Sequence, residues 1–264
     1  MLHSISSIIK QYNTGEQPVL ATCSDGHDYV CKYPLSSASA YKLACELAGN
    51  ELAKAWELNS PETAIIKISA KHQSGIKSSS IFERVCIGSR LLPNAIDITP
   101  ISAKAVAATE NSLIDLLTIS LFDLWVANED RNFNNYNLLY DLNQCRLVPI
   151  DFGCIFNSST FDFPLSQLTL SDSLIYSELF TNMAESYKYI KEFDFINNFK
   201  GIYLDKAEAS KPRIQHIVNS IPQEWNISSQ RVKAKLGELF SEMWIENVWE
   251  NFIDILLTST SQKQ

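Results

Sequence analysis

Two nearby stretches decide how this sequence is interpreted: NEDRNFNNYNLLYD at residues 128–141 and VPIDFG at residues 148–153. The first ten residues of the longer stretch hold five Asn, one Arg and two acids. They lie between an apolar pattern of helical period and the strand-like NLLY, and ordinary turns need far fewer Asx residues. The composition indicates a loop with a specific task.

The segment between the two stretches predicts a short β-hairpin, with NLLY and RLVPI as its strands and DLNQ as its turn. The centre of this hairpin falls near residue 143. Facing residues of an antiparallel ladder have numbers with a constant sum, so we expect Asp151 opposite Asn135. The hairpin would then bring Asp130, Asn135 and Asp151 together.

These three side chains suit phosphoryl transfer. One carboxylate and one amide oxygen make a poor cage for Ca²⁺ but suit Mg²⁺, which keeps waters and completes its shell with substrate phosphates. Asp130 would remain free to accept the proton of a hydroxyl group. The alternative is a turn whose Asx residues bond only their own backbone. We expect Asn134 and Asn137 to shape the loop, and Arg131 to clamp a nearby carboxylate.

The first 90 residues predict a small α+β layer. PVLATCS and YVCKYP flank Asp25 and Gly26, which predicts a hairpin, and a two-residue turn there sets Cys23 opposite Asp28. Residues 36–58 predict one long helix that ends at Asn59-Ser60-Pro61. TAIIKI and IFERVCI predict two more strands, joined by the Ser-rich loop HQSGIKSSS (residues 72–80).

The rest of the chain predicts mainly helices. A leucine pattern of helical spacing starts at Ser112, with Asn111 or Ser112 as its cap. Helical periodicity also covers SLIYSELFTNMAESYKYIKEF (residues 173–193) and ELFSEMWIENVWENFIDILL (residues 238–257), and the tryptophans near the C-terminus are expected in the core. We therefore predict an α+β chain with a β-rich lobe at residues 1–90 and a helical lobe at residues 91–264.

DRNFNNYNLL followed by VPIDFG resembles the catalytic and metal loops of the HipA-like kinases, distant relatives of protein kinases and phosphatidylinositol kinases. The resemblance extends to DGHDYVCK, CELAGNELAKAWELNSPE, GSRLL and IPQEW. It implies a two-lobed, protein-kinase-like fold, with the catalytic loop at residues 128–137 and the metal loop at residues 150–153. The sequence lacks GxGxxG before Lys32, which leaves amides of the first hairpin or the Ser-rich loop to cover the phosphates.

The resemblance also implies roles for single residues. Asp130 would be the general base, Asn135 and Asp151 the Mg²⁺ ligands, Lys32 a contact of the ATP phosphates, and Glu46 the acid that positions Lys32. Strand parity agrees, because Lys32 shares a face with Val30 and a buried lysine needs an anion.

Three alternatives concern the lysine and its acid. Lys32 could be an exposed strand lysine. Lys42 lies four residues before Glu46 and could pair with it at the surface. Glu51 is the fallback acid.

Composition narrows the function classes. The formal charge of −8 argues against direct binding to nucleic acid or to an anionic membrane, and no apolar run has the length of a membrane span. The N-terminus does not resemble a signal peptide, so a cytoplasmic protein is expected. The six cysteines show no metal-ligand spacing and are expected to be reduced.

We expect an enzyme that transfers the γ-phosphoryl group of ATP, with Mg²⁺, to a Ser or Thr hydroxyl of a protein. One alternative is a catalytically silent module that binds nucleotide or a partner protein. Another is a lipid kinase, against which the acidic charge and the lack of a basic amphipathic helix argue. HipA-like kinases include toxin components, which implies an antitoxin or another regulatory protein as a candidate partner. Residues 78–80 are a candidate site of autophosphorylation.

Overall fold

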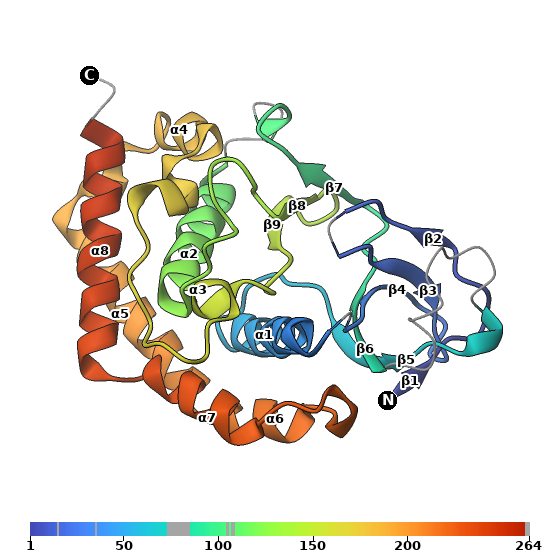
Figure 1. Ribbon diagram of the computed structural model, residues 1–264. Helices are drawn as coiled ribbons and strands as arrows, with labels where there is room; N and C mark the ends of the chain where they lie inside the picture. The colour runs from blue at the N-terminus through green and yellow to red at the C-terminus, as the bar shows by residue number, and fades with distance from the viewer. Residues whose placement is uncertain (15, 35, 73–84, 104–105, 107–108, 262–264) are drawn as a thin grey trace.

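The computed structural model describes residues 1–264 except 15, 35, 73–84, 104–105, 107–108 and 262–264. A curled sheet forms one lobe and a larger group of helices forms the other, with a small second sheet between them (Figure 1). The prediction of an α+β chain with a small β-rich lobe and a mainly helical lobe is confirmed. Nearly all of the Ser-rich loop, with residues 78–80, lies outside the described residues.

The sheet of the N-terminal lobe has the strand order β1-β5-β6-β4-β3-β2. Only β1 and β5 pair in parallel; the other neighbours are antiparallel. Its strands are β1 (Leu2–His3), β2 (Lys10–Gln11), β3 (Val19–Thr22), β4 (Asp28–Lys32), β5 (Thr63–Lys67) and β6 (Val85–Arg90). The two-residue strands β1 and β2 were not predicted, since such short elements carry no periodicity.

The hairpin of β3 and β4 was predicted, but its register was not. Val19 pairs with Cys31 and Thr22 with Asp28, and the Cys23 amide donates to the His27 carbonyl at 2.9 Å. Cys23 therefore faces His27 rather than Asp28. The turn spans residues 24–26 and ends on Gly26 at φ +82°, a left-handed conformation that glycine adopts without strain.

Strand β4 presents two different faces. Tyr29, Cys31 and Tyr33 are buried in a small core that they share with residues of β3, β5 and β6, whereas Val30 and Lys32 are only partly buried. This alternation is the predicted one, and it points Lys32 away from the small core towards helix α1.

Helix α1 (Ser37–Ala55) confirms the long helix predicted in the N-terminal lobe. Ser36 caps it, in a capping box with Ser39. Its apolar side belongs to the large core of the helical lobe rather than to the core of the sheet, as the burial of Leu43, Leu52 and Trp56 in that core shows. In Figure 1, α1 lies between the sheet and the helices, so it connects the two lobes.

A second sheet, of order β7-β8-β9, follows the crossing between the lobes. Its strands are β7 (Ala95–Ile98), β8 (Leu138–Asp141) and β9 (Arg146–Pro149). The hairpin of β8 and β9 is the predicted one, and β7 was not predicted. Leu138 pairs with Pro149, and the Ile150 amide donates to the Asn137 carbonyl at 3.0 Å. The centre of the hairpin thus lies between residues 143 and 144 rather than at residue 143, and Asp151 does not face Asn135.

The turn explains this difference. Asp141 and Arg146 form the last pair, so the loop contains four residues, and the Asp141 carboxylate accepts bonds from the amides of Asn143 and Gln144. Cys145 closes the loop at φ +53°. Cysteine is not a residue typical of left-handed positions, so nothing in the sequence indicated that Cys145 belongs to the loop and Asp141 to β8.

Helix α2 (Glu110–Val126) runs through the core of the C-terminal lobe. Thr109 caps it, instead of Asn111 or Ser112, by accepting a bond from the Ser112 amide. The other segments assigned as helical are α3 (Ile155–Ser159), α4 (Glu178–Ala184), α5 (Phe193–Ser210), α6 (Arg213–Ser220), α7 (Ser229–Glu238) and α8 (Glu242–Ser261).

The C-terminal tryptophans confirm one prediction and the stretch before α5 corrects another. Trp225, Trp244 and Trp249 are buried, as expected. The helix predicted over residues 173–193 is shorter: only α4 is regular, with 3₁₀ turns on both sides. Within the described part of the chain, no helix has the length and apolar character that a membrane span requires.

Candidate active site

The predicted catalytic loop, residues 128–137, begins where α2 ends, and Arg131 holds it in place. The Arg131 side chain is completely buried, and its Nε donates to Asp123 Oδ2 of α2 at 3.2 Å. Its Nη1 donates to the carbonyls of Asn137 and Ile150 at 3.3 and 3.2 Å. The predicted clamp on a carboxylate is confirmed. Arg131 thereby joins the end of α2 to both strands of the β8–β9 hairpin.

The partner of Arg131 is itself unusual. Burial raises the pKa of Asp123 to about 6, against the opposite effects of Arg131 and of the Asn128 amide, which donates to Asp123 Oδ1 at 3.0 Å. A buried carboxylate with an arginine and an amide as its neighbours is strongly oriented. Asp123 therefore fixes the position of the first residues of the predicted catalytic loop relative to α2.

Asp130 lies next to Asn137 rather than Asn135. The Asn137 amide nitrogen donates to Asp130 Oδ2 at 3.0 Å, and Asn137 lines the same cleft as Asp151. Asn135 is exposed, exchanges main-chain hydrogen bonds with Asn132, and lines a neighbouring shallow pocket instead. No hydrogen bond of the Asn135 side chain is found among the described residues. The expectation that Asn137 only shapes the loop is thus incomplete.

The observed register accounts for only part of this placement. Leu138 pairs with Pro149, so Asp151 comes opposite Tyr136 rather than Asn135. Asn137 directly precedes β8, and its carbonyl accepts a hydrogen bond from the Ile150 amide, next to Asp151. The register alone does not choose between the two asparagines, which lie on either side of Tyr136.

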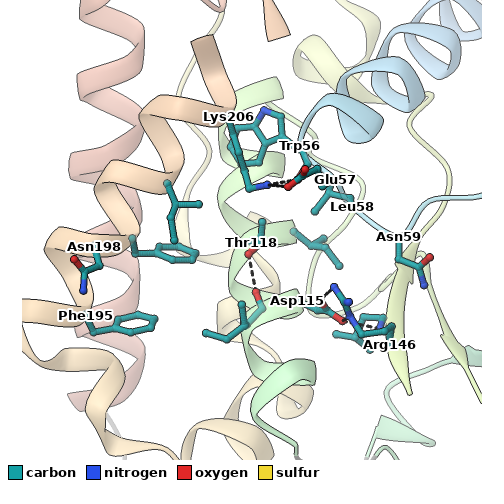
Figure 2. A pocket seen from close by; sticks show the side chains of 15 residues that line it. Trp56, Glu57, Leu58, Asn59, Asp115, Thr118, Arg146, Phe195, Asn198 and Lys206 are labelled. Atoms are coloured by element: carbon teal, nitrogen blue, oxygen red, sulfur yellow. Dashed lines mark hydrogen bonds and ion pairs between the residues drawn. The ribbon is translucent and has the colours of Figure 1, made fainter. Parts of the chain in front are cut away.

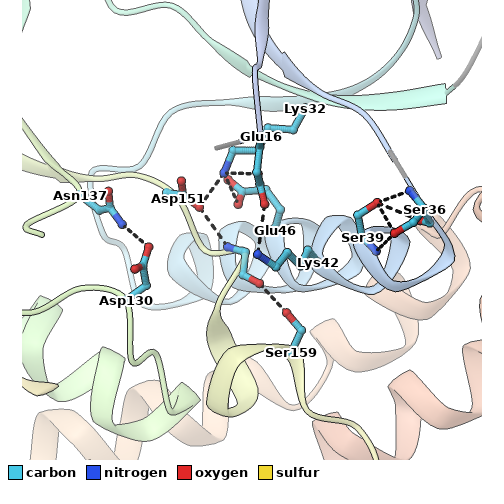
Figure 3. A network of polar contacts seen from close by, with 11 residues as sticks. Glu16, Lys32, Ser36, Ser39, Lys42, Glu46, Asp130, Asn137, Asp151 and Ser159 are labelled. Carbon is cyan, nitrogen blue, oxygen red and sulfur yellow. Dashed lines mark hydrogen bonds and ion pairs between the residues drawn. The ribbon is translucent and has the colours of Figure 1, made fainter. Parts of the chain in front are cut away.

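Lys32 lies between Glu46, the acid predicted to position it, and Asp151, which was predicted as a metal ligand. Its Nζ is 3.1 Å from Glu46 Oε2 and 2.6 Å from Asp151 Oδ1 (Figure 3). The Lys32 side chain is 14% exposed and that of Glu46 only 2%. The three residues come from β4, from the middle of α1 and from the segment after β9. The Lys32 ammonium group therefore joins the N-terminal sheet to helix α1 and to the predicted metal loop, residues 150–153.

The charges in this group depend on one another. Burial alone would lower the pKa of Lys32, but the carboxylates around it raise the pKa above its usual value. Burial raises the pKa of Glu46, although Lys32 opposes the shift. Burial acts in the same way on Asp151, but the charge and hydrogen bond of Lys32 outweigh it, so the pKa of Asp151 is lowered. Asp151 is therefore an anion at neutral pH.

The alternative partners considered from the sequence lie elsewhere. Lys42 is 3.5 Å from Glu16 Oε1, and no ion pair of Lys42 with Glu46 is found among the described residues. Glu51 accepts from Lys54 at 2.8 Å, one turn further along α1. Glu46 is the acid that the structure places on Lys32.

Lys32, Glu46 and Asp151 lie at the inner end of a cleft of about 430 Å³ between the lobes. Val30 of β4 and Leu139 of β8 line it from the two sheets. Tyr12, Arg90 and Asp97 line it as well, and burial and the charge of Asp97 raise the pKa of Tyr12. A cleft with both apolar and charged lining suits a ligand that has a flat apolar part and an anionic part.

A second cavity, of about 330 Å³, lies between the end of α1 and helices α2 and α5 (Figure 2). Its two cations are already paired: Arg146 binds both carboxylate oxygens of Asp115, and Lys206 contacts Glu57. It does not contain the predicted catalytic residues. The cleft with Lys32 is the better candidate for a reaction site.

The metal loop is followed by a strained turn. Asp151 has φ +60°, and four successive residues, Phe156 to Ser159, have φ between 51 and 64°. The segment labelled α3 is thus a left-handed turn, which side chains with a Cβ rarely adopt. Glu129 of the catalytic loop accepts hydrogen bonds from the side chains of Asn157 and Ser158 at 3.1 and 2.7 Å.

A metal ion would find few protein ligands in the cleft. Among the residues that the structure describes, no three His, Cys, Asp or Glu side chains are grouped to hold a metal ion. The Asp151 carboxylate and the Asn137 amide oxygen line the same cleft and are ligands that Mg²⁺ accepts. This donor set fits Mg²⁺ if nucleotide phosphates complete the shell.

Comparisons with known proteins agree with this geometry. The family model described as HipA-like kinase matches residues 5–248. A solved structure, the proinflammatory kinase CtkA of Helicobacter pylori, is similar over 99% of this chain and 98% of its own, with 14% sequence identity and a TM-score of 0.51. At this identity the similarity concerns the fold alone. No curated protein sequence matches the chain.

Proposed function

The chain belongs to the HipA-like kinase family and is a kinase-like phosphotransferase; from this premise we propose that it transfers the γ-phosphoryl group of ATP, with Mg²⁺, to a Ser or Thr hydroxyl of a protein. The observation that carries the proposal is the position of Lys32. It joins Glu46 and Asp151 at the inner end of the cleft, with Asp130 and Asn137 on the catalytic loop.

Each residue has a part in the proposed reaction. Asp130 accepts the proton of the attacking hydroxyl, and Lys32, oriented by Glu46, binds the phosphates. When bound, Mg²⁺ would neutralise charge on the phosphates. Asp151 and Asn137 would hold it, with Asn137 in the place that the sequence assigned to Asn135. The Asn137 nitrogen orients Asp130, and its oxygen is left for the metal.

The adenine ring would lie in the apolar part of the cleft. Val30 and Leu139 line this part from opposite sides, next to Leu91 and Leu92 of the crossing between the lobes. Catalysis would then come from positioning and from charge neutralisation, with little covalent chemistry left to the protein. A protein acceptor, a cytoplasmic location and an antitoxin or regulatory partner stay predictions of the family resemblance.

The test is phosphate transfer from γ-labelled ATP with Mg²⁺ to a generic protein acceptor and to the protein itself. Label should appear with the wild type and fall by at least about 10²-fold in Asp130→Ala, because proton transfer and positioning are lost together. Mapping the labelled residues would also test residues 78–80 as acceptors. Equal label in both proteins would contradict the assignment of Asp130.

A silent binding module would give a different result. Neither protein would transfer label, but ATP would still bind in the presence of Mg²⁺, and Asp151→Ala would abolish the Mg²⁺ dependence. If the wild type bound no ATP at all, the cleft would not be a nucleotide site.

A further inference from the structure

Glu16 lies beside Lys32, the residue proposed above to bind the nucleotide phosphates (Figure 3). It belongs to the loop between β2 and β3, which also contributes Tyr12, Thr14 and Pro18 to the cleft. Its carboxylate oxygens are 3.8 Å from Lys32 Nζ and 3.5 Å from Lys42 Nζ. One carboxylate from this loop thus connects Lys32, which lines the cleft, with Lys42 of helix α1.

The three carboxylates around Lys32 are not equally free to move away. Glu46 is buried in the middle of α1, and Asp151 is fixed in a turn in which its Oδ1 also accepts from the Gly153 amide at 3.4 Å. The side chains of Glu16 and Asp151 are 39% and 36% exposed, but the contact of Glu16 with Lys32, at 3.8 Å, is the longest of the three. Glu16 is therefore the carboxylate that Lys32 holds least tightly and that water can most easily hydrate.

Phosphate and Glu16 compete for the same cations. Two anions that share one ammonium group repel each other, and this repulsion is largest at a poorly hydrated site. Since Glu46 is needed to orient Lys32 and Asp151 to hold the metal, Glu16 is the carboxylate that has to leave.

The departure of Glu16 leaves Lys42 without its anion. Lys42 lies one helical turn before Glu46, on the same face of α1, and its carbonyl is near Gly153 of the metal loop. Glu16 provides the ion pair found for Lys42 among the described residues. The Lys42 side chain is 42% exposed, so its ammonium group can bind a phosphate oxygen in place of the Glu16 carboxylate.

On the basis of the proposed function, we propose that Glu16 is an internal competitor of the nucleotide phosphates and that Lys42 is a second phosphate-binding lysine. Nucleotide binding exchanges the Glu16 carboxylate for phosphate at both lysines. This exchange compensates for the absence of GxGxxG before Lys32, because the second lysine supplies part of the attraction that main-chain amides of such a loop would supply. Affinity for ATP, but not for adenosine, then depends on both residues.

The experiment compares the affinities of ATP with Mg²⁺, and of adenosine, for the wild type, Glu16→Gln and Lys42→Gln. Glu16→Gln should bind ATP about fivefold more tightly, and Lys42→Gln about tenfold more weakly. Both variants should bind adenosine within about twofold of the wild type, since only charge at the phosphate end has changed. Lys54→Gln is the matched control, because Lys54 stands on the same helix and pairs with Glu51.

The outcomes separate this inference from the proposed function. If the wild type binds ATP and neither substitution changes its affinity relative to adenosine, Glu16 and Lys42 are not phosphate-site residues and the inference fails alone. If neither the wild type nor Glu16→Gln binds ATP, the proposed function fails. ATP binding that is detectable only after Glu16→Gln would support both.

Discussion

Helix α1 and the metal loop are in contact at a glycine, which makes the substitution Gly49→Ala informative. A Cβ at position 49 would lie 2.3 Å from Phe152 Cβ and 2.7 Å from its Cγ. An ordinary contact starts at 3.4 Å, so the helix and the loop would have to separate by 1.1 Å or more, the difference between 3.4 and 2.3 Å. The methyl group would act as a wedge between Glu46 and Asp151.

Phe152 cannot easily yield to this wedge. It is completely buried, packs edge-on against Phe122 at 5.8 Å between ring centroids, and lies under the Arg131 guanidinium at 4.9 Å. Overpacking of this kind costs about 1–3 kcal/mol. The better helix propensity of alanine returns about 1 kcal/mol, so the net loss of stability is about 0–2 kcal/mol. A displacement of about 1 Å at a reacting site lowers a rate by about 10²-fold.

The assay measures thermal unfolding and phosphate transfer from γ-labelled ATP on the same preparations. Gly49→Ala should lower the transfer rate by about 10²-fold while the protein stays folded, because the wedge separates two halves of the site. Gly201→Ala is the control: position 201 lies in α5, and a Cβ there would meet no atom within 4 Å. It should raise the unfolding temperature by about 2–4 °C and leave transfer unchanged. Wild-type transfer in Gly49→Ala would refute the proposed coupling of α1 to the metal loop.

Three further predictions concern the loops of the site. Asn137→Ala should lower the rate of Mg²⁺-dependent phosphate transfer by about 10²-fold, and Asn135→Ala should lower it by less than about threefold. A large loss of transfer in Asn135→Ala alone would show that Asn135, and not Asn137, holds the metal. Glu129→Ala removes the acceptor of two hydrogen bonds, so amide hydrogens of residues 155–160 should exchange at least about tenfold faster, and unchanged exchange would show that the left-handed turn is stable without it. Burial raises the pKa of Cys154 to about 11, so its alkylation should be slower than that of the exposed Cys145 at pH 7.5 and should increase with pH as the thiolate forms; equal rates followed by mass spectrometry would contradict this.

The parts of the fold that the sequence predicted depend on periodicity, and the parts it missed depend on turn geometry. Strand parity placed Lys32 on the face opposite Tyr29, Cys31 and Tyr33, and helical spacing placed Glu46 on the next helix. The family resemblance then chose Glu46 as the partner of Lys32, and this choice did not depend on any hairpin register. Both hairpins were predicted, but each register was wrong by one, because Gly26 and Cys145 take left-handed conformations in the turns and change which residues face each other.

The register also concerns the site. Asp130 and Asp151 were predicted from the motif, and Asn135 was chosen from the hairpin centre and from the family pattern. The observed register brings Asp151 opposite Tyr136, between the two asparagines. Of these two, Asn137 lines the cleft with Asp151, and Asn135 lines the neighbouring pocket. The acid Glu16 was missed for another reason, since a single Glu in a loop shows no pattern.

The unusual composition of residues 128–137 follows from the two neighbours of Asp130. Arg131 donates to the Ile150 carbonyl, directly before Asp151, and Glu129 accepts from side chains of the left-handed turn after it. Asp151 and that turn both have positive φ, a conformation that persists only where surrounding contacts fix it. The predicted catalytic loop thus places Asp130 next to Asn137, which lines the cleft, and supplies on either side of Asp130 the groups that hold the predicted metal loop in a strained shape. A loop that served only as a turn would need neither the buried arginine nor the glutamate.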